Sequence, residues 1–220
     1  MSLSSRESYD PVILSANWSR PLHTACKRIV DFGGSICLLL LLCPIFLVLV
    51  LVVKLTSRGP IFYRWRVVGQ SGVPFTGYKF RSMVANADEL KAKLMVQNEM
   101  TGPVFKLTGD PRVTAVGTWM RRYSLDELPQ LYSVFRGDMS LVGPRPPLFA
   151  EYARFTEFQK QKVTVKPGIT CLWQVNGRNQ VRDFDEWVKL DLEYIQKWSL
   201  ALDLKILFRT IQAVFAGSGK

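Results

Sequence analysis

The longest apolar segment of the chain lies near its N-terminus. Residues 33–53 read GGSICLLLLLCPIFLVLVLVV, and no charged side chain interrupts these 21 positions. A helix of this length is long enough to cross the hydrocarbon core of a bilayer once. Pro44 lies in the middle, where it removes a backbone hydrogen bond and kinks or breaks a helix. The pattern therefore predicts a membrane-inserted helix with a break at Cys43–Pro44.

Basic residues flank this segment on both sides, with Lys27 and Arg28 before it and Lys54 and Arg58 after it. Cytoplasmic segments beside membrane helices are rich in lysine and arginine. We therefore expect both ends on the cytoplasmic side, which a helix that dips into the membrane and returns would satisfy. A single kinked span stays an alternative, because proline is tolerated in spanning helices.

Two short stretches rich in aromatic and β-branched residues follow the apolar segment. Residues 61–67 and 73–80 are separated by the turn sequence GQSG, and this pattern predicts a β-hairpin. Lys79 and Arg81 lie at its end, where the alternation of a strand would send both to one face. They are candidate substrate-binding residues, or else solvated charges at a strand edge.

Helical patterns account for much of the remaining chain. Residues 148–163 carry aromatic side chains at spacings of three, which is more typical of core or membrane contact than of a cofactor site. A last helix begins at Ser199 or Asp203, and its apolar surface suits a helix lying on a membrane. The other predicted helices cover residues 85–98, residues 113–122, and residues 184–197 with Asp183 as N-cap.

Composition narrows the classes of function. The net charge is +11 although 48% of the residues are hydrophobic, which suits an anionic membrane, a phosphate-bearing substrate or nucleic acid as partner. No run of five or more basic residues occurs, which argues against nucleic acid. The four cysteines show no metal-ligand spacing and indicate a reducing compartment. His23 is the only histidine, which excludes a Ser-His-Asp triad.

The strongest candidate chemistry lies in residues 121–147, RRYSLDELPQLYSVFRGDMSLVGPRPP. Asp126 and Glu127 stand between Arg121 and Arg145 in this stretch. Pro129 is best tolerated in the first turn of a helix, so we expect a helix from near Asp126 towards residue 135. Carboxylates at a helix start are stabilised by its free N–H groups. Arginines can hold phosphate oxygens while a carboxylate oxygen attacks phosphorus.

A simpler interpretation of this stretch also stands. Ser124 and Glu127 have the spacing of a capping box, and Asp126 is an ordinary acidic residue of a first helical turn. Further along, residues 166–179 read KPGITCLWQVNGRN and predict a loop. In that loop Gln174 and Arg178 could bind a nucleobase or ribose edge, or could equally satisfy backbone groups.

Taken in order, these motifs resemble one known family. The basic-flanked apolar helix with its central proline is followed by YKFRSM, RRYSLDELPQL, GDMSLVGPRPP, KPGITCLWQVNGRN and LDLKIL. This order is similar to that of the bacterial sugar transferases, the monotopic phosphoglycosyl transferases that act on polyprenol phosphate. The resemblance covers about residues 24–215. Many relatives carry extra spanning helices before this core, so we expect this chain to be the minimal form.

The resemblance implies an α+β, mostly helical fold at the cytoplasmic face of the bacterial inner (plasma) membrane. It has a reentrant, monotopic membrane helix and a small catalytic domain with a β-hairpin and amphipathic interfacial helices. Membrane lipid is then a partner, nucleic acid is not, and a homodimer is compatible with the family. The expected parts are an N-terminal tail (1–22), the reentrant helix (23–58), the catalytic domain (59–203) and a C-terminal amphipathic helix (204–220).

The resemblance also implies a reaction. The family transfers a sugar-1-phosphate from a nucleoside diphosphate sugar, here expected to be a UDP-hexose, to polyprenol (undecaprenyl) phosphate, and it depends on Mg²⁺. By motif position, Asp126 would be the nucleophile and a Mg²⁺ ligand, and Glu127 would help to activate the acceptor. Lys79, Arg121 and Arg145 would hold phosphates.

Two positions depart from the family pattern. Some relatives have serine where this chain has Cys43, which puts in doubt a hydroxyl cap at the helix break. Cys171–Leu172 replace a glycine and a small residue, which favours the exopolysaccharide branch that primes with glucose or galactose phosphate. The alternative function is a non-catalytic, membrane-anchored basic protein that binds anionic lipid or nucleic acid. It leaves the acidic pair unexplained, because carboxylates weaken the binding of an anion.

Overall fold

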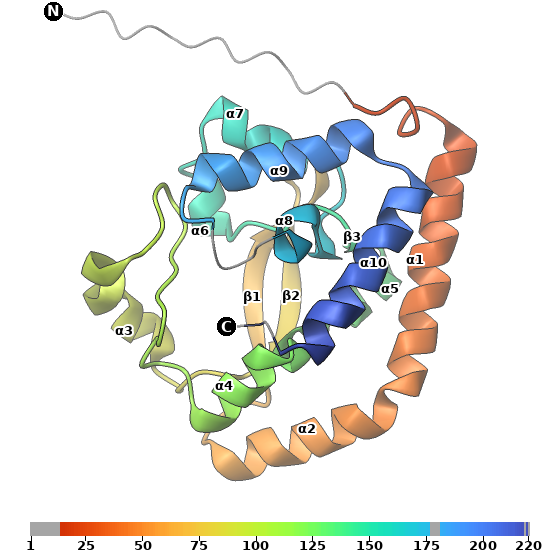
Figure 1. The fold of residues 1–220 in the computed structure, drawn as a ribbon. Coiled ribbons are helices and arrows are strands. Elements are labelled where there is room, and N and C mark those ends of the chain that lie inside the picture. Colours follow the sequence, from red (N-terminus) through yellow and green to blue (C-terminus); the bar gives the residue numbers. More distant parts are fainter. Residues whose placement is uncertain (1–13, 177–180, 218, 220) are drawn as a thin grey trace, which may run out of the picture.

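The computed structural model describes residues 14–176, 181–217 and 219. Within them the fold is mostly helical with two small two-stranded sheets, which confirms the α+β, mostly helical class. Figure 1 shows the hairpin at the centre, with α1 and α2 forming an L along two edges of the molecule. Helix α3 (Ala87–Leu94), continued by the turn η2 (Met95–Gln97), protrudes on the side away from α1.

The apolar segment forms two helices rather than one. Helix α1 (Pro21–Leu41) and helix α2 (Cys43–Thr56) meet at an angle of 62°. Among the described residues no single helix meets the length and hydropathy expected of a membrane span, whereas this bent pair meets them together. The break lies at Leu42, one residue before the predicted position, because Cys43 and Pro44 form the first turn of α2. Proline is readily accommodated there, since the N–H groups of a first turn have no helical partner.

Helix α1 has an inverted pattern of burial. Its buried side chains are polar and lie four apart, at Lys27, Asp31 and Ser35. Apolar side chains such as Ile29 and Leu40 are 69% and 73% exposed. A helix that directs its polar stripe into the protein and its apolar surface outward is suited to an apolar surrounding.

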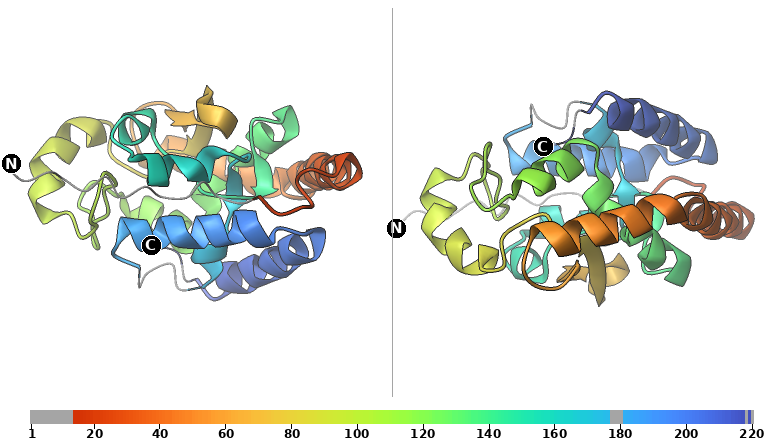
Figure 2. Two further views of the ribbon diagram at one scale, coloured as in Figure 1. Left: turned by 90° about the horizontal axis from the view of Figure 1, so that it is seen from above. Right: turned by 90° about the horizontal axis from the view of Figure 1, so that it is seen from below.

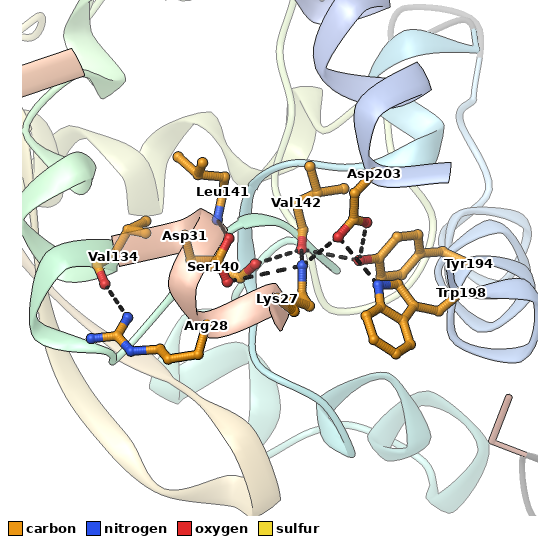
Figure 3. Close-up of polar contacts among 10 residues, drawn as sticks. All are labelled: Lys27, Arg28, Asp31, Val134, Ser140, Leu141, Val142, Tyr194, Trp198 and Asp203. Carbon is orange, nitrogen blue, oxygen red and sulfur yellow. Dashed lines mark hydrogen bonds and ion pairs between the residues drawn. The ribbon is translucent and has the colours of Figure 1, made fainter. Parts of the chain in front are cut away.

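The polar stripe of α1 is held by a buried ion pair (Figure 3). Lys27 Nζ donates to Asp203 Oδ2 at 2.7 Å and to the carbonyl of Val142 at 3.1 Å. Asp203 also accepts hydrogen bonds from the hydroxyl of Tyr194 and the indole of Trp198. A buried charge is tolerated only when it is paired and hydrogen-bonded, so this network fixes α1 against the rest of the fold.

Two further contacts extend this attachment. Asp31 accepts a hydrogen bond from the backbone N–H of Leu141 at 3.0 Å. Arg28 donates to the carbonyls of Val134 and Phe135 at the end of α5 (Gln130–Arg136), where free carbonyls favour a positive charge. The basic residues predicted as a membrane flank therefore also make contacts that hold the fold together.

The predicted hairpin is confirmed. Strand β1 (Phe62–Val68) pairs antiparallel with β2 (Pro74–Phe80) around the short turn η1 (Gln70–Gly72). One side of the hairpin packs on α2, where Phe80 joins Leu49 and Val53 in a small apolar cluster that includes Met120 of α4 (Ala115–Arg122). The other side faces the functional residues described below.

A second sheet was not predicted. Strand β3 (Ser140–Val142) pairs in parallel with β4 (Gly168–Thr170), and helix α8 (Leu172–Val175) follows at once. The prediction of a loop for residues 166–179 was thus wrong at residues 168–170 and 172–175, and residues 177–179 lie outside the described part of the chain. Strands this short give almost no periodic signal, and their pairing depends on contacts far apart in sequence.

Two long helices complete the core. Helix α9 (Phe184–Lys197) is capped by Asp183, as predicted. Helix α10 (Leu200–Phe215) is capped by Ser199, the first of the two predicted starting points. Figure 2 shows α9 and α10 together on one side of the molecule. Residues 148–163 are instead broken into three short pieces, because Thr156 starts a new capped turn. These pieces are α6 (Phe149–Tyr152), α7 (Glu157–Lys160) and η4 (Gln161–Val163).

Candidate active site

The chain turns sharply immediately before the two adjacent carboxylates. Helix α4 ends at Arg122, and Ser124 adopts a left-handed conformation with φ of 55°. Asp126 and Glu127 then lie in a single 3-10 turn, η3 (Leu125–Glu127), ahead of α5. Non-glycine residues rarely adopt this conformation, and such residues cluster at functional sites.

Two details of this turn differ from the sequence prediction. The Ser124 side chain makes no cap hydrogen bond, so the predicted capping box does not form. The expected continuous helix from near Asp126 is split, and α5 begins only at Gln130 after Pro129. The left-handed turn accounts for both changes, because it directs the chain into η3 before a regular helix can start.

The two carboxylates line a cavity of about 1500 Å³. Asp126 and Glu127 are each 7% exposed, so they lie at its inner wall. The same cavity is lined by the phosphate-binding candidates Lys79, Arg121 and Arg145. The fold thus brings together residues from β2, the end of α4, η3 and the segment after β3.

Glu127 is the centre of the charged contacts. Lys79 Nζ lies 2.7 Å from Glu127 Oε1, and Arg145 Nη1 lies 3.4 Å from the same oxygen. Burial lowers the pKa of Lys79 below its ordinary value, and the attraction of Glu127 opposes this effect without cancelling it. The site therefore concentrates positive charge around a buried carboxylate, as a site for a phosphate-bearing ligand requires.

Arg121 also lines the cavity of the dyad. Its Nε donates to Ser82 Oγ at 3.0 Å, which fixes the guanidinium group. Burial lowers the pKa of Arg121, while Asp126 and Asp110 favour its charged form. Arginine stays charged in proteins, so it supplies a permanent positive charge beside Asp126.

The remaining substrate-binding candidates do not join this cluster. Arg81 borders the cavity, but its guanidinium group donates to the carbonyl and hydroxyl of Ser57 at the end of α2, each at 2.7 Å. Gln174 accepts a hydrogen bond from the thiol of Cys171. Arg178 lies outside the described residues. Lys79 and Arg81 thus have separate environments, because β2 ends at Phe80 and strand alternation no longer applies.

Sequence reasoning missed the tryptophans of this cavity. Trp65, Trp173 and Trp187 all line it. Trp65 lies on the same face of β1 as Tyr63 and Val67, so its orientation could have been inferred from the predicted hairpin. No local signal connects Trp173 with Trp187, whose rings lie 4.1 Å apart.

The acidic residues of the cavity could hold a metal ion only if a substrate supplied further ligands. Among the described residues, no three His, Cys, Asp or Glu side chains gather as a metal site. Mg²⁺ commonly takes only one or two carboxylates from the protein and fills its shell with phosphate oxygens and water. Asp126, a carboxylate in the wall of this cavity, fits that pattern. Glu127 beside it pairs with Lys79 and Arg145.

Comparison with known proteins identifies the family. The sequence model described as "Bacterial sugar transferase" matches residues 22–217. Galactosyl transferase CpsE of Streptococcus agalactiae is 44% identical over 213 residues, which cover 97% of this chain and 47% of the relative. Undecaprenyl-phosphate galactose phosphotransferase of Salmonella typhimurium is 43% identical over 198 residues, 88% of this chain and 41% of the relative.

A third relative matches over most of both chains. Exopolysaccharide production protein ExoY of Sinorhizobium fredii is 41% identical over 204 residues, 91% of this chain and 90% of the relative. In contrast, the chain spans about half the length of the first two relatives. The match of the family model over nearly the whole chain confirms the resemblance drawn from the motifs, and the chain belongs to the bacterial sugar transferase family.

Proposed function

We propose that this chain transfers a sugar-1-phosphate from a UDP-hexose to undecaprenyl phosphate, as the initiating step of exopolysaccharide or glycoconjugate synthesis. The observation that carries the proposal is the buried dyad of Asp126 and Glu127, set among Lys79, Arg121 and Arg145 in one cavity. Two relatives support the acceptor, since they are named undecaprenyl-phosphate galactose and undecaprenyl-phosphate glucose phosphotransferases.

The chemistry proceeds in two displacements at one phosphorus atom. A carboxylate oxygen of Asp126 attacks the phosphorus that carries the sugar, and the bond to the bridging oxygen of the diphosphate breaks. UMP leaves with that electron pair, and an aspartyl-phosphosugar remains. An oxygen of undecaprenyl phosphate then attacks the same phosphorus, and Asp126 leaves as a carboxylate.

Two steps suit a site that must handle two anionic substrates. A diphosphate and a lipid phosphate repel each other and the attacking carboxylate. Lys79, Arg121 and Arg145 offset this repulsion, and a covalent intermediate means that donor and acceptor need not be bound together. In this proposal Glu127 helps to activate the incoming lipid phosphate, and its ion pairs with Lys79 and Arg145 support that role. Asp126 would hold Mg²⁺, which would stabilise the negative charge that develops on the leaving phosphate oxygen.

The membrane attachment is also part of the proposal. Helix α1 directs its polar stripe into the protein, and α2 leaves Leu47, Leu51 and Leu55 exposed. On α10, Leu204, Phe208, Ile211 and Phe215 form an exposed stripe at helical spacing. We propose that α1 and α2 enter the cytoplasmic leaflet and return while α10 lies at its surface. The active site would then lie where the lipid phosphate is.

The alternative function, binding of anionic lipid without catalysis, gives no role to the carboxylates of Asp126 and Glu127. The deciding experiment incubates the purified protein with UDP-glucose or UDP-galactose, undecaprenyl phosphate and Mg²⁺, and measures UMP release and the lipid product. We expect continued UMP release and lipid product only with undecaprenyl phosphate present, because without the acceptor each enzyme molecule releases at most one UMP as it forms the covalent intermediate. Absence of product with every UDP-hexose, by a protein that still binds anionic vesicles, would favour the alternative.

A further inference from the structure

One aromatic ring lies directly against the lysine of the site. Lys79 Nζ is 4.4 Å from the centre of the Trp65 ring, and both side chains project from the same face of the hairpin. A cation placed over an indole face is attracted by its π electrons, and tryptophan is the strongest of the aromatic partners. The Lys79 ammonium group is therefore held between this ring and Glu127.

The hairpin is built to accept this ring. Gly77 is the cross-strand partner of Trp65. A Cβ atom at position 77 would lie 2.4 Å from Trp65 Nε1, which is too close for any side chain unless the indole moves. Glycine at that position leaves room for the indole to lie against β2 and reach Lys79, two residues further along the strand.

The indole nitrogen does not explain why the ring is there. Trp65 is 7% exposed, and its buried Nε1 has no hydrogen-bond partner among the residues that the structure describes. Leaving a buried donor unpaired costs stability, so a purely structural position would favour a large apolar side chain. The feature of tryptophan that is used here is its ring face, which lies against Lys79.

We propose that Trp65 is a positioning residue for the transfer reaction, which holds the Lys79 ammonium group beside Glu127 in a slot made by Gly77. The proposal rests on the proposed function for its catalytic consequence, but not for the contact itself. Without the ring, Lys79 loses the aromatic contact and is held less firmly beside Glu127.

The proposal has a consequence for pH dependence. Lys79 faces Glu127 and Asp126 of η3 and Arg145 after β3, and its cross-strand partner is Tyr63. These groups are unchanged when Trp65 is replaced. The ring favours the charged form of Lys79, so its loss moves the pKa of Lys79 to a still lower value. Activity that needs the charged lysine then falls away at a lower pH on the alkaline side.

The test compares Trp65→Phe with Trp65→Leu in the whole 220-residue chain reconstituted with lipid. Trp65→Phe keeps an aromatic face and should stay within about threefold of the original kcat/KM. Trp65→Leu and Gly77→Ala should lower it by about 5- to 30-fold, which corresponds to the usual strength of a partly buried cation–π contact. The alkaline limb of the pH profile should shift downwards in Trp65→Leu and less in Trp65→Phe.

A matched control uses the cation–π contact of Arg66, which lies on the same strand as Trp65. Arg66 lies 4.5 Å from the ring centre of Phe149, outside the dyad, so Phe149→Leu removes a similar contact without touching Lys79. We expect Phe149→Leu to leave kcat/KM within about twofold and the pH profile unchanged. Thermal unfolding of every variant separates lost stability from lost positioning.

A second measurement needs no turnover. Competitive acetylation of Lys79 with acetic anhydride across a pH series, followed by mass spectrometry, reports the fraction of uncharged amine. We expect the midpoint for Lys79 to fall in Trp65→Leu relative to Trp65→Phe. Equal midpoints and equal losses of activity in the two variants would overturn the proposal and leave Trp65 as a packing residue. An inactive original protein with the expected midpoints would instead count against the proposed function.

Discussion

Lys79 and Glu127 are 48 positions apart in the chain, yet their side chains form an ion pair of 2.7 Å. Lys79 comes from the second strand of the hairpin, and Glu127 comes from a 3-10 turn reached through the left-handed Ser124. The pair joins the hairpin to the acidic dyad, and Arg145 completes it from a third segment. The electrostatics of the site therefore depend on the relative placement of three parts of the fold.

Replacement of the proposed nucleophile gives the first prediction. Asp126→Asn keeps the size of the side chain but removes the attacking carboxylate, so UMP release should fall by at least about 1,000-fold. Intact-protein mass spectrometry should show no phosphosugar adduct, and the unfolding temperature should change little. Asp138→Asn is the matched control, because Asp138 pairs with Arg136 on the surface. Activity of Asp126→Asn within about tenfold of the original would refute its assignment.

The covalent intermediate gives a kinetic prediction. Labelled UMP should enter UDP-sugar without any undecaprenyl phosphate present, because the first displacement is reversible and independent of the acceptor. Initial rates with both substrates should follow ping-pong kinetics. Asp126→Asn should show no exchange. Full turnover by the original protein without exchange would favour a direct transfer between two bound substrates.

The buried pair of Lys27 and Asp203 gives a pH-dependent prediction. Lys27→Met should lower the free energy of unfolding at pH 7 by about 3–5 kcal/mol, because it leaves Asp203 buried without its charge partner. Burial already raises the pKa of Asp203 above its ordinary value, and loss of Lys27 raises it further. A raised carboxyl pKa favours folding below the unfolded-state pKa, and this advantage is lost as pH rises through the folded-state pKa.

The deficit of Lys27→Met should therefore be smaller near pH 4 than at pH 7, which thermal unfolding at the two values measures. Lys197→Met is the control, since Lys197 forms an exposed pair with Glu193 and should change stability by less than about 0.5 kcal/mol. A deficit that stays constant or grows towards pH 4 would contradict the assigned role of Asp203.

The same ion pair bears on topology. Because it fixes α1 to α10, residues before α1 should lie on the same side of the membrane as the rest of the fold. Single cysteines at the exposed positions Ser19 and Glu157, in a protein without native cysteines, should both resist an impermeant thiol reagent on intact cells. Combining Pro44→Leu with Lys27→Met should increase labelling at position 19. If Pro44 and Lys27 are unchanged, labelling at position 19 without labelling at position 157 would indicate a helix that crosses the membrane.

The sequence by itself determined the elements that depend on neighbouring residues. The hairpin, the helix caps at Asp183 and Ser199 and the break beside Pro44 all follow from patterns within a few positions. The motifs also supplied Lys79, Arg121, Asp126, Glu127 and Arg145 as candidates, and all five line one cavity. Their chemical types and the order of the motifs were sufficient for that result.

Only the tertiary structure decided which of these residues contact one another. The parallel pairing of β3 with β4, the left-handed Ser124 and the capping of α2 by Arg81 have no signal in local periodicity. From the sequence, Lys27 was interpreted as part of a membrane flank and Asp203 as a possible helix start. The structure shows that they form a buried ion pair across 176 positions. Such contacts depend on how the whole chain packs, because a buried charge must find its partner wherever the fold brings one within reach.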